Sequence, residues 1–483
     1  MKNTPETNFP SRTLPLFVDL DGTLIHSDCL WEGLLLLLRS NLLAVVMLPL
    51  WIVRGKSYFK RQVAARTSLN PESLPYNSAV VEYIKREKLN GRDIILATAT
   101  DEHVATPIAD YLGLFDAVLA TKDGSNNSST TKLSAIKTYT QGGAFDYIGN
   151  SHDDIPLWQS SAHAVIVSSS PGFVEKVRRI QPAIEVLEGT SYTLLTVVKA
   201  MRVYQWVKNI LLFVPLLLAH RLFEPDVFLT TCIAFLCFSL CASSVYILND
   251  LLDLESDRLH VRKKNRPFAS GKLPISLGVM LVPLLIICAF GGSYLFVSQD
   301  FTIVLLAYFA ITTAYTFLLK KIAIIDVLLL AGLYAFRLLA GAIAGDVLIS
   351  QWLIAFSVFI FLSLAFVKRY SELIALIADN KTEAKGRAYT VGDVDLLRSV
   401  GTACGLVSIL IFAFYINSRE VTNLYHRPQL LWGVGICLLY WILRVWFVAH
   451  RGQMHDDPII FTVKDKASYV VVALLVTIVV FAL

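Results

Sequence analysis

The feature that most constrains this chain is a series of long apolar runs in its second half. Each run is close to the ~20 residues that a helix needs to cross the hydrocarbon core of a bilayer. A backbone in lipid has to satisfy its own hydrogen bonds, so runs of this length predict transmembrane helices. The second half, from about residue 191 to 483, is therefore predicted to be an all-α transmembrane bundle. We count about nine spans, at 208–221, 226–249, 275–298, 300–319, 322–344, 350–368, 397–417, 429–449 and 467–483.

The charged residues between the apolar runs predict the topology. Lys and Arg gather in alternate loops, at 258–272, 320–321, 368–398 and 444–466. The positive-inside rule assigns such loops to the cytoplasm, and nine spans then place the C-terminus outside. No secretory signal opens the chain, which predicts a cytoplasmic N-terminal domain and a multi-pass protein of a bacterial inner membrane. Because the bases lie between spans, we expect membrane lipids and phosphates as partners and no nucleic acid.

A dense group of charged residues follows the second apolar run, in the segment NDLLDLESDRLHVRKKNRPFASG. If the helix continues through it, Asn249, Asp253 and Asp257 lie on one face, with Asp250 beside them. Carboxylates one turn apart repel, and burial disfavours their charge, so a divalent cation is the expected partner. Mg²⁺ takes one or two protein carboxylates and keeps other positions for water and phosphate. The segment predicts a Mg²⁺ and phosphate site, and a solvated helix end is the alternative.

Basic residues that suit the anion come directly after the acids, and they include Arg258, Arg262 and Arg266. NDLLDLESD resembles the NDxxDxxxD motif of the UbiA superfamily of intramembrane prenyltransferases, in which two metal ions hold a diphosphate. The trailing RPFASG also matches that family. The resemblance covers roughly residues 200 to 483 and implies the UbiA fold for the transmembrane bundle.

The N-terminal part of the chain has a different pattern, because a short apolar strand ends there in two acids. In LPLFVDLDGTL the strand leads into Asp19 and Asp21, and a glycine turn follows. This order predicts both carboxylates at the carboxyl edge of a parallel sheet, where α/β folds keep their sites. One carboxylate can attack phosphorus while the other protonates the leaving oxygen, with a metal offsetting the charge.

The stretch DLDGT resembles the first motif of haloacid dehalogenase-like (HAD) phosphatases. This resemblance implies a Rossmann-like α/β domain over residues 13–190, and the other family motifs follow in order. RDIILAT ends in Thr98, which would hydrogen-bond the transferred phosphoryl group. Lys132 matches the lysine of the third motif, although a solvated helix lysine is the alternative.

The fourth motif of that family resembles FDYIGNSHDDIP, in which Asn150 and Asp154 would join Asp19 as ligands of a second Mg²⁺. Many relatives have Asp where Asn150 stands. This departure puts the metal affinity, and with it the phosphatase activity, in question.

An apolar stretch, LWEGLLLLLRSNLLAVVMLPLWIV, lies between the first two predicted strands. It falls inside a predicted cap at about residues 28–90. Arg39 and its polar neighbours interrupt it, so a helical hairpin on the membrane surface is favoured over a span. The basic run at 54–66 would then face anionic headgroups. A simple buried cap is the alternative, and residues 1–12 are expected to be a mobile tail.

The later cytoplasmic loops hold further polar side chains that suit phosphate binding. Together with the acidic segment they predict a pocket of acids for metal and bases for phosphate. A snorkelling membrane anchor is the alternative for the KRY stretch. The candidate residues are Tyr315, Lys320, Lys368, Arg369, Tyr370, Glu372 and Arg387.

Aromatic prenyltransferases of the superfamily carry a second acidic motif, DxxxD, which is missing from KRYSELIALIADNKTEAKGRAY. Instead YTFLLKKIAIIDV, KRYSEL and RAYT resemble the polyprenyl-phosphate phosphoribosyltransferases. That resemblance implies Mg²⁺-dependent transfer of a phosphoribosyl group from 5-phosphoribosyl diphosphate to a polyprenyl phosphate. The HAD-like domain would then remove the 5-phosphate from the product.

Two other functions stay open on the sequence. The first is a prenyltransferase that joins a prenyl diphosphate to an aromatic acceptor, and the second is a lipid-binding membrane module that tethers a phosphatase. The segment His455–Asp457 reads as a surface acidic turn, with metal binding as the alternative. The oligomeric state is left open, a homo-oligomer included.

Overall fold

The computed structural model describes residues 14–40, 44, 46–122, 129–378, 380, 388–418, 421, 424–454 and 457–483. The expected tail at residues 1–12 and the candidate Arg387 lie outside the described residues. The contacts within the chain divide it into two compact units. The first joins Met1–Met201 to Tyr246–Val282, and the second joins Arg202–Val245 to Pro283–Leu483.

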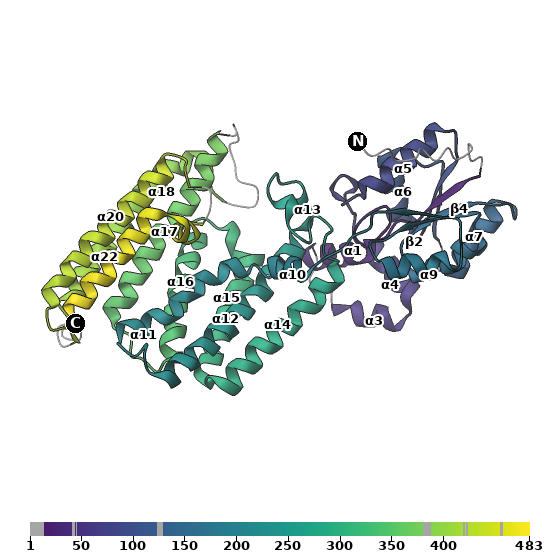
Figure 1. The fold of residues 1–483 in the computed structure, drawn as a ribbon. Coiled ribbons are helices and arrows are strands. Elements are labelled where there is room, and N and C mark those ends of the chain that lie inside the picture. The colour runs from purple at the N-terminus through teal and green to yellow at the C-terminus, as the bar shows by residue number, and fades with distance from the viewer. Residues whose placement is uncertain are drawn as a thin grey trace, which may run out of the picture. The chain divides into compact units, whose positions relative to one another are not determined.

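A six-stranded sheet forms the centre of the first unit (Figure 1). Its strand order is β3-β2-β1-β4-β5-β6, and every pair of neighbours is parallel. The order reverses at β1, so the carboxyl ends of β1, β2 and β4 meet where open α/β sheets hold their ligands. The predicted parallel sheet is therefore confirmed. The strands are β1 Leu16–Val18, β2 Ile94–Asp101, β3 Ala117–Thr121, β4 Asp146–Gly149, β5 His163–Val167 and β6 Ile184–Leu187.

Both faces of the sheet are covered, because alternate side chains of its apolar strands point to opposite sides. Leu16 and Val18 pack into one hydrophobic cluster, whereas Phe17 between them packs into another. The covering helices are α5 Ser78–Leu89, α6 Glu102–Leu112, α7 Ser129–Tyr139, α8 Ile155–Ser160 and α9 Pro171–Arg178, with the 3-10 turn η2 His152–Asp154.

Helices α1 Cys29–Ser40, α3 Leu48–Val53 and α4 Lys56–Ala64, with the turn η1 Pro71–Ser73, lie between β1 and β2 in the chain. This is where the sequence predicts an inserted cap. Apolar side chains of α3 are exposed, among them Val53 at 86%. Such a surface suits the predicted contact of this insertion with lipid headgroups, which stays a prediction.

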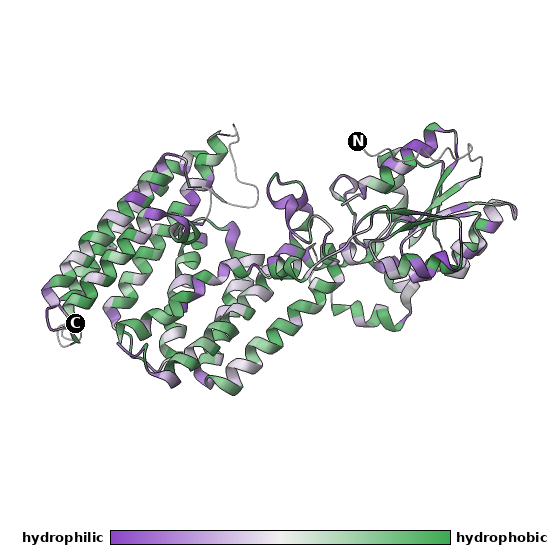
Figure 2. Ribbon diagram, in the orientation of Figure 1, coloured by the Kyte–Doolittle hydropathy of each residue, from purple (hydrophilic) through white to green (hydrophobic). Residues whose placement is uncertain are grey.

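Among the described residues, seven helices are long and apolar enough to cross a membrane. The number of spans rises to as many as nine if each of two bent helix pairs counts as one span. These pairs are Leu194–Ala200 with Val203–Leu218, and Pro458–Lys464 with Lys466–Ala482. Apolar residues run along these helices in Figure 2. The chain is a multi-pass membrane protein. The seven are α12 Pro225–Leu252, α14 Ile275–Phe296, α15 Gln299–Phe317, α16 Ile325–Ala344, α17 Gln351–Ala378, α18 Val394–Ile416 and α20 Leu431–His450.

Shorter elements connect these helices or form the bent pairs. They are α10 Leu194–Ala200, η3 Val203–Phe213, α11 Val214–Leu218, α13 Leu254–Arg258, η4 Lys263–Asn265, η5 Leu319–Lys321, η6 Val391–Asp393, η7 Pro428–Leu430, α21 Pro458–Lys464 and α22 Lys466–Ala482.

Candidate functional site

The carboxyl edge of the sheet brings a buried lysine onto the first predicted acid. Lys132, on α7, donates from Nζ to Asp19 Oδ1 at 2.8 Å and to the Tyr147 hydroxyl at 3.0 Å. Both Asp19 and Lys132 are buried, which excludes a solvated lysine. Burial raises the pKa of Asp19 to about 7, although the adjacent Lys132 acts in the opposite direction. The pair places a carboxylate and a cation where a phosphoryl group can be bound.

Asp21 is held by groups from the next strand and from the inserted helix. Its Oδ2 accepts from Thr100 Oγ1 at 2.6 Å, and its Oδ1 accepts from the backbone of Cys29 at 2.8 Å. Thr98 is fully buried, and its Oγ1 accepts from the Thr100 backbone at 3.0 Å. Thr98 and Thr100 are two residues apart on β2 and so share a face. The sequence prediction named Thr98 and missed Thr100, for which the repeat in LATAT was the available signal.

The loop after β4 lies against the glycine turn of DLDGT. A Cβ atom on Gly22 would approach Asn150 Nδ2 to 2.2 Å, and Gly22 has a positive φ of 73°. Glycine is therefore required there for both space and conformation. Asp154 is buried, and its carboxylate accepts from the Tyr147 hydroxyl at 2.9 Å and from the backbone of Asn150 at 3.1 Å.

The acidic segment keeps helical spacing across a break. Helix α12 ends at Leu252 and α13 begins at Leu254, with Asp253 between them. The backbone of Asp253 donates to the Asn249 carbonyl at 3.0 Å, and that of Asp257 donates to the Asp253 carbonyl at 2.8 Å. The predicted succession of acids along one face therefore survives, although the helix does not run through unbroken.

Two acids of this segment converge on one guanidinium. Arg266 Nη1 donates to Asp250 Oδ1 at 3.0 Å and also to Asp257 Oδ2. Both carboxylates are buried, with 3% and 2% of their side chains exposed. Burial raises the pKa of Asp257 above its usual value, although Arg266 acts against it. The two acids therefore create a negative potential between them, which the guanidinium of Arg266 neutralises in the structure and which suits a cation.

The oxygen donors at both sites are of the kind that Mg²⁺ binds. Among the described residues, however, no group of three or more His, Cys, Asp and Glu side chains is placed to hold a metal. Mg²⁺ in proteins is commonly held by one or two carboxylates, with water and substrate phosphate oxygens as its other ligands.

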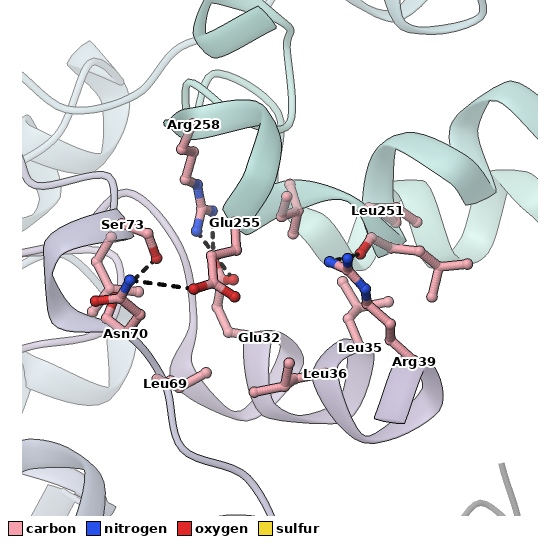
Figure 3. Close-up of a pocket in the computed structure, with 13 residues that line it drawn as sticks. Glu32, Leu35, Leu36, Arg39, Leu69, Asn70, Ser73, Leu251, Glu255 and Arg258 are labelled. Atoms are coloured by element: carbon pink, nitrogen blue, oxygen red, sulfur yellow. Dashed lines mark hydrogen bonds and ion pairs between the residues drawn. The ribbon is translucent and has the colours of Figure 1, made fainter. Parts of the chain in front are cut away.

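The inserted helices contact the acidic segment within the first unit (Figure 3). Arg258 on α13 pairs with Glu32 on α1, and each side chain is 7% exposed. Asn70 Nδ2 donates to Glu255 Oε1 at 3.2 Å, and Arg39 Nη1 donates to the Leu252 carbonyl at 3.3 Å. Arg258 was expected to face an anion, but here it ties α13 to α1.

In the second unit, several predicted phosphate ligands form one buried network. Arg369 donates to Asp326 Oδ1 at 2.9 Å, to the Tyr315 hydroxyl at 3.1 Å and to Glu372 Oε2 at 2.6 Å. Tyr315 also donates to Asp326 at 2.7 Å. The sequence prediction thus gathered residues that do meet. Their role in phosphate binding stays a prediction, because two carboxylates already engage this guanidinium.

The remaining candidates are dispersed. Tyr370 is buried and its hydroxyl lies 2.9 Å from His450 Nδ1. Arg262 is exposed, and Lys320 is partly buried in η5.

Asp457 corrects the prediction of a surface acidic turn, because its side chain is only 7% exposed. Its Oδ2 accepts from Lys208 at 2.8 Å and from Lys368 at 3.2 Å, and the Tyr334 hydroxyl donates to Oδ1 at 3.1 Å. The correction concerns Asp457 alone, since His455 and Asp456 lie outside the described residues.

Comparison with known proteins fixes the family. The model of the UbiA prenyltransferase family matches residues 210–464, more than half of the chain. The chain belongs to the UbiA prenyltransferase family. This match covers most of the second unit and the acidic segment, in agreement with the resemblance of NDLLDLESD.

Relatives of this UbiA protein extend the comparison. The uncharacterized protein y4nM of Sinorhizobium fredii is 35% identical over 468 residues, 96% of this chain and 90% of that protein. A decaprenyl-phosphate phosphoribosyltransferase of Mycolicibacterium smegmatis is 33% identical over 231 residues, 47% of this chain and 71% of that enzyme. A solved UbiA homologue from Archaeoglobus fulgidus, bound to DMAPP and Mg²⁺, has a TM-score of 0.44 at 13% identity, covering 58% of this chain and 98% of that one.

In the helical part of the chain, the sequence prediction missed Lys208 and Tyr334. Lys208 and the adjacent Asn209 are the polar residues of the otherwise apolar stretch WVKNILLF. A charge inside an apolar run is rare unless it has a function, and this was the available signal. Tyr334 gave no signal of its own, because a tyrosine in an apolar helix is common.

Proposed function

We propose that the UbiA domain transfers a phosphoribosyl group from 5-phosphoribosyl diphosphate to a polyprenyl phosphate. The observation that carries this proposal is the convergence of the buried Asp250 and Asp257 on the guanidinium of Arg266. The similarity to the decaprenyl-phosphate phosphoribosyltransferase of Mycolicibacterium smegmatis supports this choice of reaction over aromatic prenylation. The absence of a DxxxD motif from the sequence of the loop after Lys368 agrees with it.

In the proposed reaction an oxygen of the lipid phosphate attacks C1 of the ribose. The bond from C1 to the diphosphate oxygen breaks, and the diphosphate leaves with the electron pair. A phosphate monoester is already an anion near pH 7, so the attack needs no general base. Mg²⁺ bound through Asn249, Asp250, Asp253 and Asp257 would supply charge neutralisation for the departing diphosphate.

Arg266 has a defined part in this proposal. Its side chain is 26% exposed while it holds two buried acids. Its remaining guanidinium donors can bind phosphate oxygens, because arginine presents several N–H groups in one plane. Arg266 thus orients the acidic segment and offers donors to the diphosphate. Because a lysine ammonium lacks the planar set of donors, Arg266→Lys is expected to lose part of these contacts.

We further propose that the sheet domain is an HAD-type phosphatase that removes the 5-phosphate from the lipid product. Asp19 would attack phosphorus, and the adjacent Lys132 would stabilise the phosphoryl oxygens. Asp21, which Thr100 and the backbone of Cys29 hold, would protonate the leaving oxygen. Water would then attack the phosphoryl group on Asp19, release phosphate and regenerate the carboxylate. This domain would lie in the cytoplasm, with the C-terminus of the chain outside.

The test is a donor assay with purified full-length protein in detergent, Mg²⁺, a polyprenyl phosphate and labelled 5-phosphoribosyl diphosphate. Label should move into the lipid phase with the wild-type protein and not with Asp253→Ala. Asp226→Ala is the matched control, because Asp226 is an exposed acid at the other end of α12. If label stays in the aqueous phase while a prenyl diphosphate is joined to a phenolic acid, the aromatic activity replaces this proposal.

A further inference from the structure

The cluster around Asp457 places two lysines on one carboxylate oxygen. Lys208 comes from η3, Lys368 from α17 and Tyr334 from α16, and all three contact Asp457. Lys208 and Lys368 approach the same oxygen, Oδ2, at 2.8 and 3.2 Å. Among the described residues, the ion pairs of both lysines go to Asp457 alone. Two positive charges therefore face one negative charge.

The surroundings make this imbalance costly. Lys208 and Asp457 have 9% and 7% of their side chains exposed, and the helices around them are apolar. Ionisable groups in such a setting are expensive and mark functional sites. Glu372, one turn from Lys368, adds negative charge nearby, but its own ion pair is with Arg369, at 2.6 Å, and not with either lysine.

The cluster can be reached by a ligand. Lys368 is 29% exposed, whereas Lys208 behind it is buried. The two ammonium groups, which carry three donors each, and the Tyr334 hydroxyl converge on a region the size of one carboxylate. This is the donor pattern that an oxyanion needs. In the structure the carboxylate of Asp457 accepts these hydrogen bonds. Burial by itself would raise the pKa of Asp457, but the two lysines lower it by more, so that this pKa lies below its usual value.

We propose that Lys208, Lys368 and Tyr334 form a binding site for a phosphate monoester, with Asp457 as the counter-ion that holds the lysines together before the phosphate arrives. The site is additional to the acidic segment, which the proposed function assigns to the leaving diphosphate. The proposed reaction, on which the identity of the ligand rests, has two such groups: the 5-phosphate of the donor and the phosphate of the lipid acceptor.

The experiment measures equilibrium binding to full-length protein in detergent, without Mg²⁺ and without turnover. One probe is ribose 5-phosphate, which stands for the donor, and the other is farnesyl phosphate, which stands for the lipid. Lys208→Ala should weaken the binding of at least one probe about tenfold or more, since a charge-assisted contact to phosphate is lost. Loss for one probe alone identifies the source of the phosphate, and equal loss for both means that the site accepts either.

Asp457→Asn should change the affinity for the probes in the opposite direction. It removes the competing negative charge, so the affinity for the same probe should rise severalfold, and the ligand should raise the melting temperature more than in the wild type. A residue that merely supported the fold would weaken binding when changed. If Lys208→Ala folds poorly, Lys208→Arg can be measured as well. It keeps the positive charge and should therefore keep most of the affinity.

Lys466→Ala is the matched control, because Lys466 is an exposed lysine of the same unit at the start of α22. The proposal is overturned if Lys208→Ala and Lys368→Ala both leave the dissociation constants of the two probes within about twofold, or if Asp457→Asn weakens binding as they do. Because no transfer is measured, failure of the proposed reaction would leave these results unchanged, and failure here would leave the donor assay unaffected.

Discussion

The site at the sheet edge and the cluster around Asp457 are both built from buried charges, but the chain assembles them in different ways. At the sheet edge, Asp19, Thr100 and Asp154 follow or end three neighbouring parallel strands. The Asp457 cluster joins side chains up to 249 residues apart, from elements that share no sheet. A parallel sheet brings its strand ends together whatever else packs around it, whereas a helical bundle places residues only once its helix pairs are chosen.

The largest expected effect tests whether the two proposed activities are separate. Asp19→Asn should reduce the rate of phosphate release from the lipid product by about a thousandfold or more, because it removes the nucleophile. Phosphoribosyl transfer should be unchanged within about twofold. Asp253→Ala should give the reverse. Measuring both activities in both variants decides the matter, and loss of transfer in Asp19→Asn would mean that the two sites do not work independently.

Buried ion pairs in the two units offer a matched comparison of stability. Arg92 bonds Glu87 and Asp146 at 2.7 Å each, and its side chain is fully buried. Arg369 is 1% exposed and pairs with Asp326. Replacing either arginine by Met leaves buried carboxylates without their cation, which should cost roughly 3–5 kcal/mol and lower the melting temperature.

The exposed Arg179, 79% accessible, serves as the control for these variants, and Arg179→Met should leave the melting temperature unchanged. A much smaller loss for Arg369→Met than for Arg92→Met would show that the helical unit repacks where the sheet cannot.

The contact of α1 with α13 should show a smaller, reversible effect. Glu32→Arg or Arg258→Glu places like charges in a nearly buried pair and should destabilise the protein by about 2–3 kcal/mol. The double exchange should recover at least half of that loss, because the pair is restored with its polarity inverted. Melting temperatures of the four proteins give the coupling, and additive losses would contradict the contact.

The smallest effect concerns Asp116, which accepts from the backbone of Ile94 at 2.9 Å. This hydrogen bond, with help from Lys88, holds the pKa of Asp116 below its usual value. A carboxyl whose folded pKa is lowered stabilises the fold above its unfolded pKa of about 3.9, and the gain is lost as the pH falls through the folded value. Solvent screening keeps the effect to about 0.5 kcal/mol or less.

The protection factors of the β2 amides against hydrogen exchange, which are corrected for the intrinsic pH dependence of exchange, should therefore fall on acidification in the wild type. In Asp116→Asn these protection factors should be slightly lower at neutral pH and should depend less on pH. Equal pH dependence in both proteins would remove Asp116 as the cause.

The sheet site was largely predictable because its residues stand at fixed places relative to strands. DLDGT and GNSHDD follow the ends of β1 and β4, whereas LAT lies inside β2, which continues past the expected end at Thr98 to Asp101. Asp19, Thr98 and Asp154 could nevertheless be named from these motifs before their contacts were known. Lys132 was named from its motif, but its salt bridge with Asp19 depends on how α7 packs. Thr100 was missed, although strand alternation places it on the same face as Thr98 and makes it an equally good candidate.

The membrane character, the parallel sheet and the acids between Asn249 and Asp257 were predictable, because each follows from local patterns of hydrophobicity and charge. Which charges meet could be seen only in the folded chain. Arg258 pairs with Glu32, Arg369 with Asp326, and Lys208 with Asp457. The physical reason is that a buried charge must find a partner wherever the packing of the chain brings one, and sequence separation does not limit that choice.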